Sequence, residues 1–460
     1  MSRALPSLPR ALGVVLAGAL ALAVVQQQLL ARRPPRLLAL EPQAHSSGPA
    51  ALDLRFSRPM QRASLAEMSR LQPPLAHRWL GGDTQLRLLL QPGQVVRSPL
   101  SLELAGSDRR GLPLAAQRWN WDPRPLLLVV AEVTGGEQLQ ILRPDGRWQP
   151  LSAVLPRIPT LEPLADGSGV VFLASEGQGL HRLWKLSLRP RSLLRAPAAT
   201  APPQPGALVP LWPERLSFAH ASSNRRGDLL IQVGGQALGD GRTVWIDAGG
   251  RRRDLRMEVS GPILLLPEGE GMVVPTPDGL ELRALDGQGS GAAGGMGNNG
   301  GESGGRPQIL PGSRVLASFC PASGQALLVR HWPDYRRSLE RVQPGAAPLT
   351  LWLGSEAVMA ASCDQSGERA WMLLNRWDGG FAHELVQLDR TGRIVARRDL
   401  GSWAPEPGTP LSYDPAGDQL LLTLRPDPRQ PARPVLVNGR TLELRILPHP
   451  VRQAVWLPAG

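Results

Sequence analysis

The feature that most constrains the fold of this chain is a turn-and-strand unit that occurs six times after residue 160. The clearest unit, LEPLADGSGVVFLASEGQGLHRLWKLSL, covers residues 161–188. The turn glycines of the six units are 58, 44, 53, 43 and 50 residues apart: Gly169, Gly227, Gly271, Gly324, Gly367 and Gly417. Periods of roughly 40 to 50 residues with about four strands each are typical of a β-propeller, in which every blade buries its faces against its neighbours. The repeats therefore predict a β-propeller over residues 126–460.

The amino-acid composition supports an all-β fold. Gly 50 and Pro 47 together exceed a fifth of the 460 residues. Both residue types disfavour long helices and favour turns. Helical structure is expected at the N-terminus alone.

The two ends of the predicted propeller complement each other. Residues 126–151 supply three strands, whereas PVRQAVWLP at 450–458 reads as a single strand without partners. Pairing the two ends would close the ring and remove exposed strand edges. This arrangement gives seven blades, with six or eight as alternatives.

A smaller β domain is predicted over residues 44–124. In LDLRFSRPM, residues 52–60, Leu52, Leu54 and Phe56 alternate with polar residues, as in a half-buried strand. Further strand patterns follow at 85–90 and 100–106, and the region ends in RWNWDPRP at 118–125. Short strands in roughly 80 residues suit a small β-sandwich.

Two stretches of this region and two of the propeller resemble known families. FSRPM, Phe56–Met60, and SDRRGLPL, Ser107–Leu114, resemble motifs of the bacterial SbsA-type Ig-like domains. ADGSGVVFLAS and LHRLWKLSL resemble the turn and third strand of TolB-like (PD40/WD40-like) propeller repeats. The first resemblance implies a spacer or adhesion module, and the second implies a β-propeller.

The N-terminal residues 1–36 have the pattern of an export or anchoring segment. Arg3 and Arg10 precede the apolar run ALGVVLAGALALAVV, and an uncharged stretch continues to Ala31 before Arg32 and Arg33. About 20 uncharged residues can span a bilayer as a helix. We expect residues 11–31 to be a single-pass transmembrane helix in the bacterial cell envelope, with the bulk of the chain exported. Cleavage as a signal peptide at the Ala21-x-Ala23 pattern, with secretion to the periplasm, is the alternative.

The net charge of +12 does not indicate a nucleic-acid-binding protein. The chain has one lysine, Lys185, and its arginines are scattered along the sequence. Aromatic residues that would stack on bases make up 4% of the chain. No nucleic-acid partner is expected, and the short run Arg251 to Arg253 reads as a solvated loop.

Sequence motifs for catalysis are weak. GESGG at 301–305 has the G-x-S-x-G form, but it lies in the Gly-rich stretch 286–307. A nucleophile elbow needs a strand, a sharp turn and a helix around the serine, so Ser303 is interpreted as part of a flexible loop. The chain's histidines occur singly, without metal-binding spacing: His45, His77, His181, His220, His331, His383 and His449. We therefore predict no catalytic residue, no metal and no cofactor.

Three further groups of residues have structural interpretations. Aspartates at the blade turns are expected to cap their own backbone rather than bind a ligand: Asp166, Asp228, Asp278, Asp364 and Asp414. Tryptophans in apolar strands are expected to pack between blades: Trp184, Trp245, Trp352 and Trp371. Cys320 and Cys363 occupy matching places in successive units, which leaves a disulfide between adjacent blades or two buried thiols as alternatives.

These features predict a non-catalytic, membrane-tethered exported binding or scaffold protein. Its propeller would engage a protein or another cell-envelope component. The alternative is a hydrolase or lyase that acts on envelope polymers or peptides in the propeller channel, since such sites leave little sequence signature. A purely structural surface-layer role would call for tandem Ig-like copies, and one copy is predicted.

Overall fold

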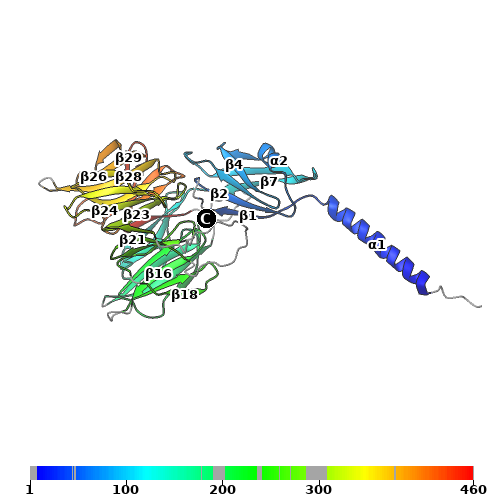
Figure 1. Cartoon of the computed structure of the whole chain (residues 1–460), viewed down its shortest axis with the longest axis horizontal. Helices are drawn as coiled ribbons and strands as arrows, with labels where there is room; N and C mark the ends of the chain where they lie inside the picture. Colours follow the sequence, from blue (N-terminus) through cyan, green and yellow to red (C-terminus); the bar gives the residue numbers. More distant parts are fainter. Residues whose placement is uncertain are drawn as a thin grey trace, which may run out of the picture.

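The structure of the chain is a computed structural model that describes residues 8–43, 45, 48–177, 179–189, 203–235, 241–257, 259–269, 271–285, 308–377 and 380–458. Its strands form a β-sandwich followed by a β-propeller, and a helix precedes both (Figure 1). The predicted loop 286–307 and its Ser303 lie outside the described residues.

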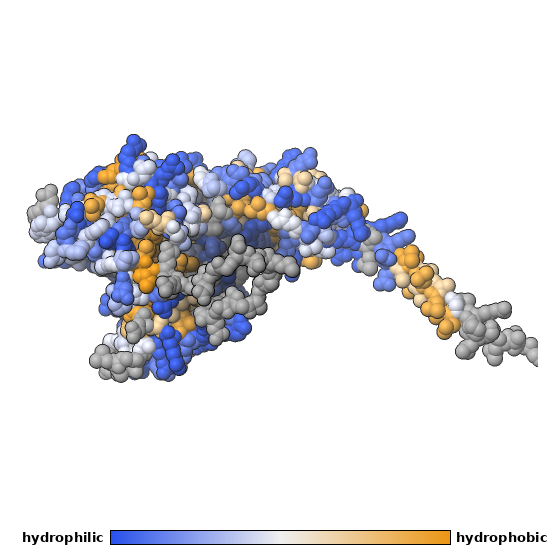
Figure 2. Space-filling view, viewed as in Figure 1, coloured by the Kyte–Doolittle hydropathy of each residue, from blue (hydrophilic) through white to orange (hydrophobic). Residues whose placement is uncertain are grey.

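The N-terminal helix α1 (Leu8–Arg32) projects away from the β domains (Figure 1). Its apolar side chains face solvent, with Val15, Leu20 and Leu22 each 69 to 71% exposed, and Figure 2 shows it as a largely apolar rod. Among the helices in the described part of the chain, none has both the length and the apolar character that crossing a membrane requires.

The sandwich consists of two antiparallel sheets and one short helix. The first sheet has the order β1-β2-β5-β4 and the second has the order β3-β6-β7. The bounds of these elements are β1 (Leu37–Gln43), β2 (Ala51–Phe56), α2 (Arg62–Met68), β3 (Arg70–Gln72), β4 (His77–Gly82), β5 (Gln85–Leu90), β6 (Leu100–Ser107) and β7 (Pro113–Trp121).

The predicted alternation in β2 is confirmed. Leu52, Leu54 and Phe56 are at most 2% exposed and join one apolar core with residues of both sheets. The sequence reading missed helix α2, whose seven residues bury only Leu65 and therefore carry almost no helical periodicity. It also placed the start of the domain at residue 44, whereas β1 begins at Leu37. β1 is an edge strand whose residues are half-buried or exposed, with a register shift between Leu37 and Ala39, so it shows no clear alternation.

The described strands after residue 125 form seven antiparallel sheets. The first sheet contains β8 (Leu126–Val133), β9 (Gly136–Leu142), β10 (Trp148–Pro150) and β36 (Val451–Leu457); the second contains β11 (Leu161–Pro163), β12 (Gly169–Gly177), β13 (Leu180–Arg189) and β14 (Gln204–Pro210); the third contains β15 (Phe218–Ser223), β16 (Leu229–Gly234), β17 (Arg242–Ile246) and β18 (Arg252–Leu255); the fourth contains β19 (Leu264–Leu265), β20 (Gly271–Thr276), β21 (Gly279–Ala284) and β22 (Gln308–Pro311).

The remaining three sheets follow the same plan. The fifth contains β23 (Arg314–Cys320), β24 (Gln325–His331), β25 (Arg337–Val342) and β26 (Leu349–Gly354); the sixth contains β27 (Ala357–Cys363), β28 (Arg369–Trp377), β29 (Phe381–Asp389) and β30 (Ile394–Asp399); the seventh contains β31 (Ala404–Pro405), β32 (Ser412–Asp414), β33 (Gln419–Arg425), β34 (Arg433–Asn438) and β35 (Leu444–Ile446). In the seventh sheet, β31 and β32 both pair with β33, so its first strand is interrupted.

The ring closes by strand exchange between its two ends, as the sequence predicts. β36 pairs with β8, from Val451 opposite Ala131 to Leu457 opposite Leu126. It also contacts β33 of the seventh sheet and β11 of the second. The C-terminal strand thus completes the first sheet and leaves no open seam between the ends.

The tryptophans and four of the six predicted turn glycines have the structural roles that the sequence predicts. The prediction is wrong for Gly169 and Gly271, which begin strands β12 and β20 two residues after the glycines with positive φ, Gly167 and Gly269. Gly227, Gly324 and Gly367 have φ values of 86°, 65° and 75°, a conformation that other residues adopt with strain. Trp371 is fully buried between the sixth and seventh sheets. The other three tryptophans, Trp184, Trp245 and Trp352, pack against buried clusters of the neighbouring sheets.

The sandwich docks on the turns of the sixth and seventh sheets. The Gln365 side-chain amide donates to the carbonyl oxygens of His45 and Gly48 at 3.0 and 2.9 Å. The Val96 N–H donates to the Ala416 carbonyl at 2.8 Å, and Ala416 joins the apolar core of the sandwich. One end of the propeller is therefore covered by the preceding domain.

Cys320 and Cys363 form a disulfide that joins the fifth and sixth sheets. Their Cα atoms are 5.7 Å apart, and both residues belong to the buried cluster between these sheets. Each cysteine ends the first strand of its sheet, β23 or β27. Matching positions in adjacent repeats therefore lie next to each other in space.

Candidate functional site in the central channel

The innermost strands of the sheets surround a channel through the propeller. These strands are β36, β11, β15, β19, β23, β27 and β32, one from each sheet. Successive members of this set contact each other around much of the ring. Their short length, two or three residues in β11, β19 and β32, exposes side chains and loops to the channel.

Two cavities follow one another along this channel. The first, of about 440 Å³, lies against the sandwich, because His45, Pro49, Pro123 and Pro125 line it. The second, of about 640 Å³, is lined by the propeller alone, including the segment 406–411 that interrupts the seventh sheet. Ligand sites commonly have volumes of about 300 to 1,000 Å³, so the second cavity has the size of a binding site at the end that the sandwich leaves uncovered.

Glu162 of β11 lies at the middle of the channel, since it lines both cavities. Desolvation by the surrounding protein raises the pKa of its carboxyl to about 8. Within the described residues, no hydrogen bond or ion pair engages this carboxyl. Glu162 is half-buried, and an acid without a partner in such a cavity is typical of functional positions more than of structural ones.

Two histidines line the second cavity together with Glu162. His220 of β15 is largely buried, which lowers the pKa of its imidazole, and its Nε2 atom is buried without a hydrogen-bond partner in the described part of the chain. Burial also lowers the pKa of His331, at the end of β24. Both rings are therefore neutral at pH 7 and can accept or donate a hydrogen bond.

The other charged groups of this cavity are held in ion pairs. Arg452 donates to Glu137 at 2.6 Å, and Glu406 accepts from Arg425 at 2.6 Å. Glu137 also accepts the Ile158 N–H at 2.5 Å. These pairs fix the rim of the cavity, while Glu162 and His220 keep unused hydrogen-bonding capacity.

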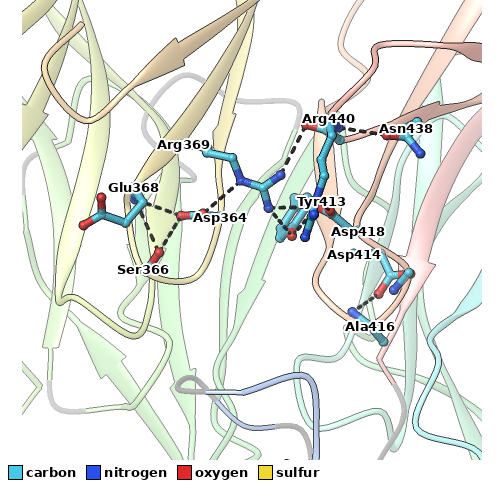
Figure 3. A network of polar contacts seen from close by, with 12 residues as sticks. Asp364, Ser366, Glu368, Arg369, Tyr413, Asp414, Ala416, Asp418, Asn438 and Arg440 are labelled. Carbon is cyan, nitrogen blue, oxygen red and sulfur yellow. Dashed lines mark hydrogen bonds and ion pairs between the residues drawn. The ribbon is translucent and has the colours of Figure 1, made fainter. Parts of the chain in front are cut away.

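A second polar cluster lies at the end of the propeller that faces the sandwich (Figure 3). Arg369 of β28 donates to Asp364 at 3.3 Å, Asp418 at 2.8 Å and the Tyr413 hydroxyl at 3.0 Å. Arg440 also pairs with Asp418 at 2.8 Å. Burial is the main cause that raises the pKa of Tyr413. Because every member contacts another member across the sixth and seventh sheets, this cluster is a structural clamp.

Asp414 lies beside this clamp and is almost completely enclosed. Burial raises the pKa of its carboxyl to about 7, although backbone N–H groups of Ala416 and Gly417 donate to it at 2.8 Å. The charge of Arg124, in the connection from the sandwich, acts in the opposite direction. Asp414 therefore links the turn of the seventh sheet to the domain boundary.

Three of the five turn aspartates, Asp166, Asp364 and Asp414, cap the backbone of their own turn as predicted, whereas Asp228 accepts from an N–H 20 residues further along the chain. Asp166 accepts from the Ser168 N–H, Asp228 from the Ala248 N–H, Asp364 from the Glu368 N–H, and Asp414 as described above. Asp278 is exposed, and its carbonyl oxygen accepts the Gly312 N–H.

The remaining histidines are dispersed, and the structure brings only His220 and His331 to one cavity. His449 stacks on Trp148 with ring centroids 4.2 Å apart, and His77 contacts the Leu75 carbonyl oxygen. His181 and His383 lie in β13 and β29, and His45 lines the cavity under the sandwich. In the described part of the chain, no group of three or more His, Cys, Asp or Glu residues is placed to hold a metal ion.

Sequence reasoning missed Glu162, although one signal was present. The residue lies between Leu161 and Pro163 in the short stretch TLEPL, where a charge interrupts an apolar strand pattern. That pattern marks a charged residue in a buried strand, but it does not reveal that the strand borders a channel.

The chain has remote structural similarity to several solved proteins. No family model matches the chain, and no curated protein matches it. Similar solved structures include the uncharacterized protein lmo1340 from Listeria monocytogenes EGD-e (11% identity, 70% of this chain and 91% of that chain, TM-score 0.47) and TolB from Acinetobacter baumannii (11% identity, 79% and 81%, TM-score 0.38). The β-propeller domain of the Trilobed protease from Pyrococcus furiosus is also similar (10% identity, 77% and 96%, TM-score 0.43). The closed ring of antiparallel sheets in the described part of the chain makes it a β-propeller protein.

Proposed function

We propose that the protein is a non-catalytic binding protein whose open channel cavity receives a cationic group from a protein partner. The single observation that supports this proposal is the Glu162 carboxyl, which lies in the channel without a partner. A guanidinium or ammonium group would supply the charge that stabilises the ionised carboxylate, because an opposite charge within hydrogen-bonding distance favours the charged form. His220 offers a second hydrogen-bonding group in the same cavity.

Binding of a guanidinium ion is expected to strengthen as the pH rises through about 8. Glu162 is mostly protonated at pH 7 and mostly ionised at pH 9, since its pKa is about 8. The ionised fraction, and with it the affinity, should rise about tenfold over this interval. The measurement is calorimetric titration of the full chain with butylguanidinium, which keeps its charge throughout this range.

Two variants test the role of the carboxyl. Glu162→Gln should remove the pH dependence and most of the binding, whereas the exposed Glu443→Gln should bind as the unaltered protein does. Equal affinities at pH 7 and pH 9 for the unaltered protein would contradict the proposal.

A hydrolase acting in the channel is the second candidate. Glu162 and His220 line one cavity, and their pKa values are shifted in opposite directions, which is the pattern of an acid and base pair. Turnover of peptides by the purified protein that disappears in Glu162→Gln would favour this candidate over binding alone.

For the location, we propose the bacterial cell envelope. The supporting observation is the exposed apolar surface of α1, which water solvates poorly and which a membrane or an export machinery would accept. Fractionation of native cells should place the full chain with the membranes or, after loss of α1, in the periplasm. Sequencing of the mature N-terminus distinguishes these two outcomes, and recovery of the intact chain in the cytoplasm alone would refute the proposal.

A further inference from the structure

One of the seven contacts between neighbouring sheets lacks an apolar core in the described part of the propeller. Six contacts contain buried clusters, for example Leu128 with Phe172 between the first and second sheets and Leu327 with Met372 between the fifth and sixth. Between the fourth and fifth sheets there is instead a cleft of about 310 Å³. Neighbouring blades normally bury their facing surfaces, so this contact is incomplete.

Both walls of the cleft are largely apolar, and the two carboxylates in its lining, Glu268 and Glu281, are paired with Arg225 and Arg283 at 2.6 Å each. The strand register places Val273, Leu280, Leu282 and Leu310 on one face of the fourth sheet. The facing wall of the fifth sheet consists of Leu316, Phe319, Ala326, Leu328 and Val342. Leu280 and Leu328 are at most 4% exposed, and the other seven are half-buried. The walls therefore retain apolar surface that a ligand can cover.

The sequence that connects β21 to β22 contains few apolar side chains. Residues 286–307 join β21 to β22, and both strands contribute to the cleft. Apart from Pro307, the apolar side chains of this segment are Ala292, Ala293 and Met296. An external apolar group is the better match to walls built from leucine, valine and phenylalanine.

The cleft has a positively charged group beyond its apolar walls. Arg314 lies two residues before Leu316 on β23, and Arg330 lies two residues after Leu328 on β24, in register with Arg314. Both pair with Glu340, at 2.9 Å for Arg314 Nε and 3.6 Å for Arg330 Nη1. Two guanidinium groups thus share one carboxylate, which leaves an excess of one positive charge.

Arg314 keeps an unused donor at this position. Its side chain is 5% exposed, and its Nη1 atom is buried without a hydrogen-bond partner among the described residues. A Cβ built on Gly312 would lie 3.4 Å from this atom. Gly312 follows Leu310, a residue of the cleft wall, by two positions, so Nη1 lies close to the end of that wall. A buried guanidinium donor without an acceptor is costly unless a ligand supplies one.

We propose that the cleft binds a fatty carboxylate, with its alkyl chain between the walls of the fourth and fifth sheets and its carboxylate at Arg314. The alkyl chain would remove apolar surface of both walls from water, which favours binding in proportion to the area covered. The carboxylate would form a charge-assisted hydrogen bond with Nη1, which is stronger than a bond between neutral groups. The cleft borders the channel, since Leu316 and Phe319 line both, but the proposed ligand contacts Arg314 rather than Glu162, so the proposal does not depend on the role proposed for the channel.

The test is calorimetric titration of the full chain with dodecanoate below its micelle concentration. One saturable site is expected, with affinity at least about tenfold higher than for dodecyltrimethylammonium, because the cation meets the excess positive charge. The exposed apolar surface of helix α1 also attracts alkyl chains without forming a defined site. The part of the titration that does not saturate is therefore subtracted. Both titrations are repeated with Glu162→Gln, which removes the channel carboxyl that a cation would also engage. Equal affinities of this variant for the anion and the cation would overturn the assignment of the carboxylate to Arg314.

Variants locate the site. Ala326→Phe should fill the cleft from the fifth sheet and weaken dodecanoate binding at least about tenfold, with an unchanged or higher melting temperature. The exposed Ala347→Phe is the matched control and should bind normally. Arg314→Lys retains the charge but loses the free Nη1 and should weaken binding several-fold. If Ala326→Phe does not fold, Val342→Phe fills the same wall from β25, and unchanged binding in the folded variant would overturn the proposal.

Discussion

Reduction of the Cys320–Cys363 disulfide is expected to lower the free energy of unfolding by about 4 kcal/mol. The bond joins residues 43 positions apart. A cross-link over a loop of that size removes chain entropy from the unfolded state that corresponds to about 4 kcal/mol at 25 °C. Both cysteines are at most 5% exposed, and they lie in the apolar cluster between the fifth and sixth sheets. The disulfide therefore links these two sheets from within their shared core.

Because of its position in the ring, reduction of the disulfide is also expected to destabilise the fifth sheet locally. The fifth sheet faces the cleft on its other side, where no buried cluster of described residues holds it to the fourth sheet. After reduction, the fifth sheet depends on the one apolar cluster that it shares with the sixth. We therefore expect its amide protons to lose protection from exchange earlier than those of the second sheet, which is packed on both sides.

Urea unfolding followed by tryptophan fluorescence measures this effect, with and without reductant. The matched control is the double variant Cys320→Ala/Cys363→Ala, whose unfolding midpoint should not respond to reductant. An unchanged midpoint in the unaltered protein after complete reduction would show that the bond contributes nothing to stability.

Much of the architecture could be predicted from local sequence because the fold is built from repeated local units. The alternation of Leu52, Leu54 and Phe56 identified a half-buried strand, and the unpartnered strand 450–458 identified the closure of the ring. The matching positions of Cys320 and Cys363 reflect equivalent positions in adjacent sheets. In each case a pattern within about ten residues, or a fixed repeat, carries the information.

The candidate site could not be predicted in this way, because it depends on how the sheets meet. Glu162 and His220 are 58 residues apart and belong to different sheets, and only the closed ring places them at one cavity. The cleft depends on two apolar faces that fail to close on each other, and nothing in the sequence of Phe319 or Leu282 separates them from residues of a filled interface. Helix α2 was missed for a simpler reason, since it buries one residue.

Glu162→Gln is expected to make the protein relatively more stable at alkaline pH. The pKa of this carboxyl is about 8 in the folded protein and about 4.5 in the unfolded chain. Because the folded-state pKa is raised, the folded protein binds the proton more tightly than the unfolded chain does. The stability that this proton contributes is fully present below about pH 4.5 and is lost as the pH rises through about 8. At about 1.4 kcal/mol for each pKa unit, the total loss relative to low pH approaches 5 kcal/mol by pH 9.

The decisive quantity is the difference in unfolding free energy between Glu162→Gln and the unaltered protein, measured by urea titration at several pH values. This difference should shift in favour of the variant by about 4 kcal/mol between pH 5 and pH 9. Asp414 also has a raised pKa, but it titrates in both proteins and cancels in the comparison. Glu443→Gln, at an exposed position, should show a constant difference over the same range. If the Glu162→Gln difference is equally constant, the carboxyl is hydrated in the folded protein, and the channel is wide enough to admit bulk water around it.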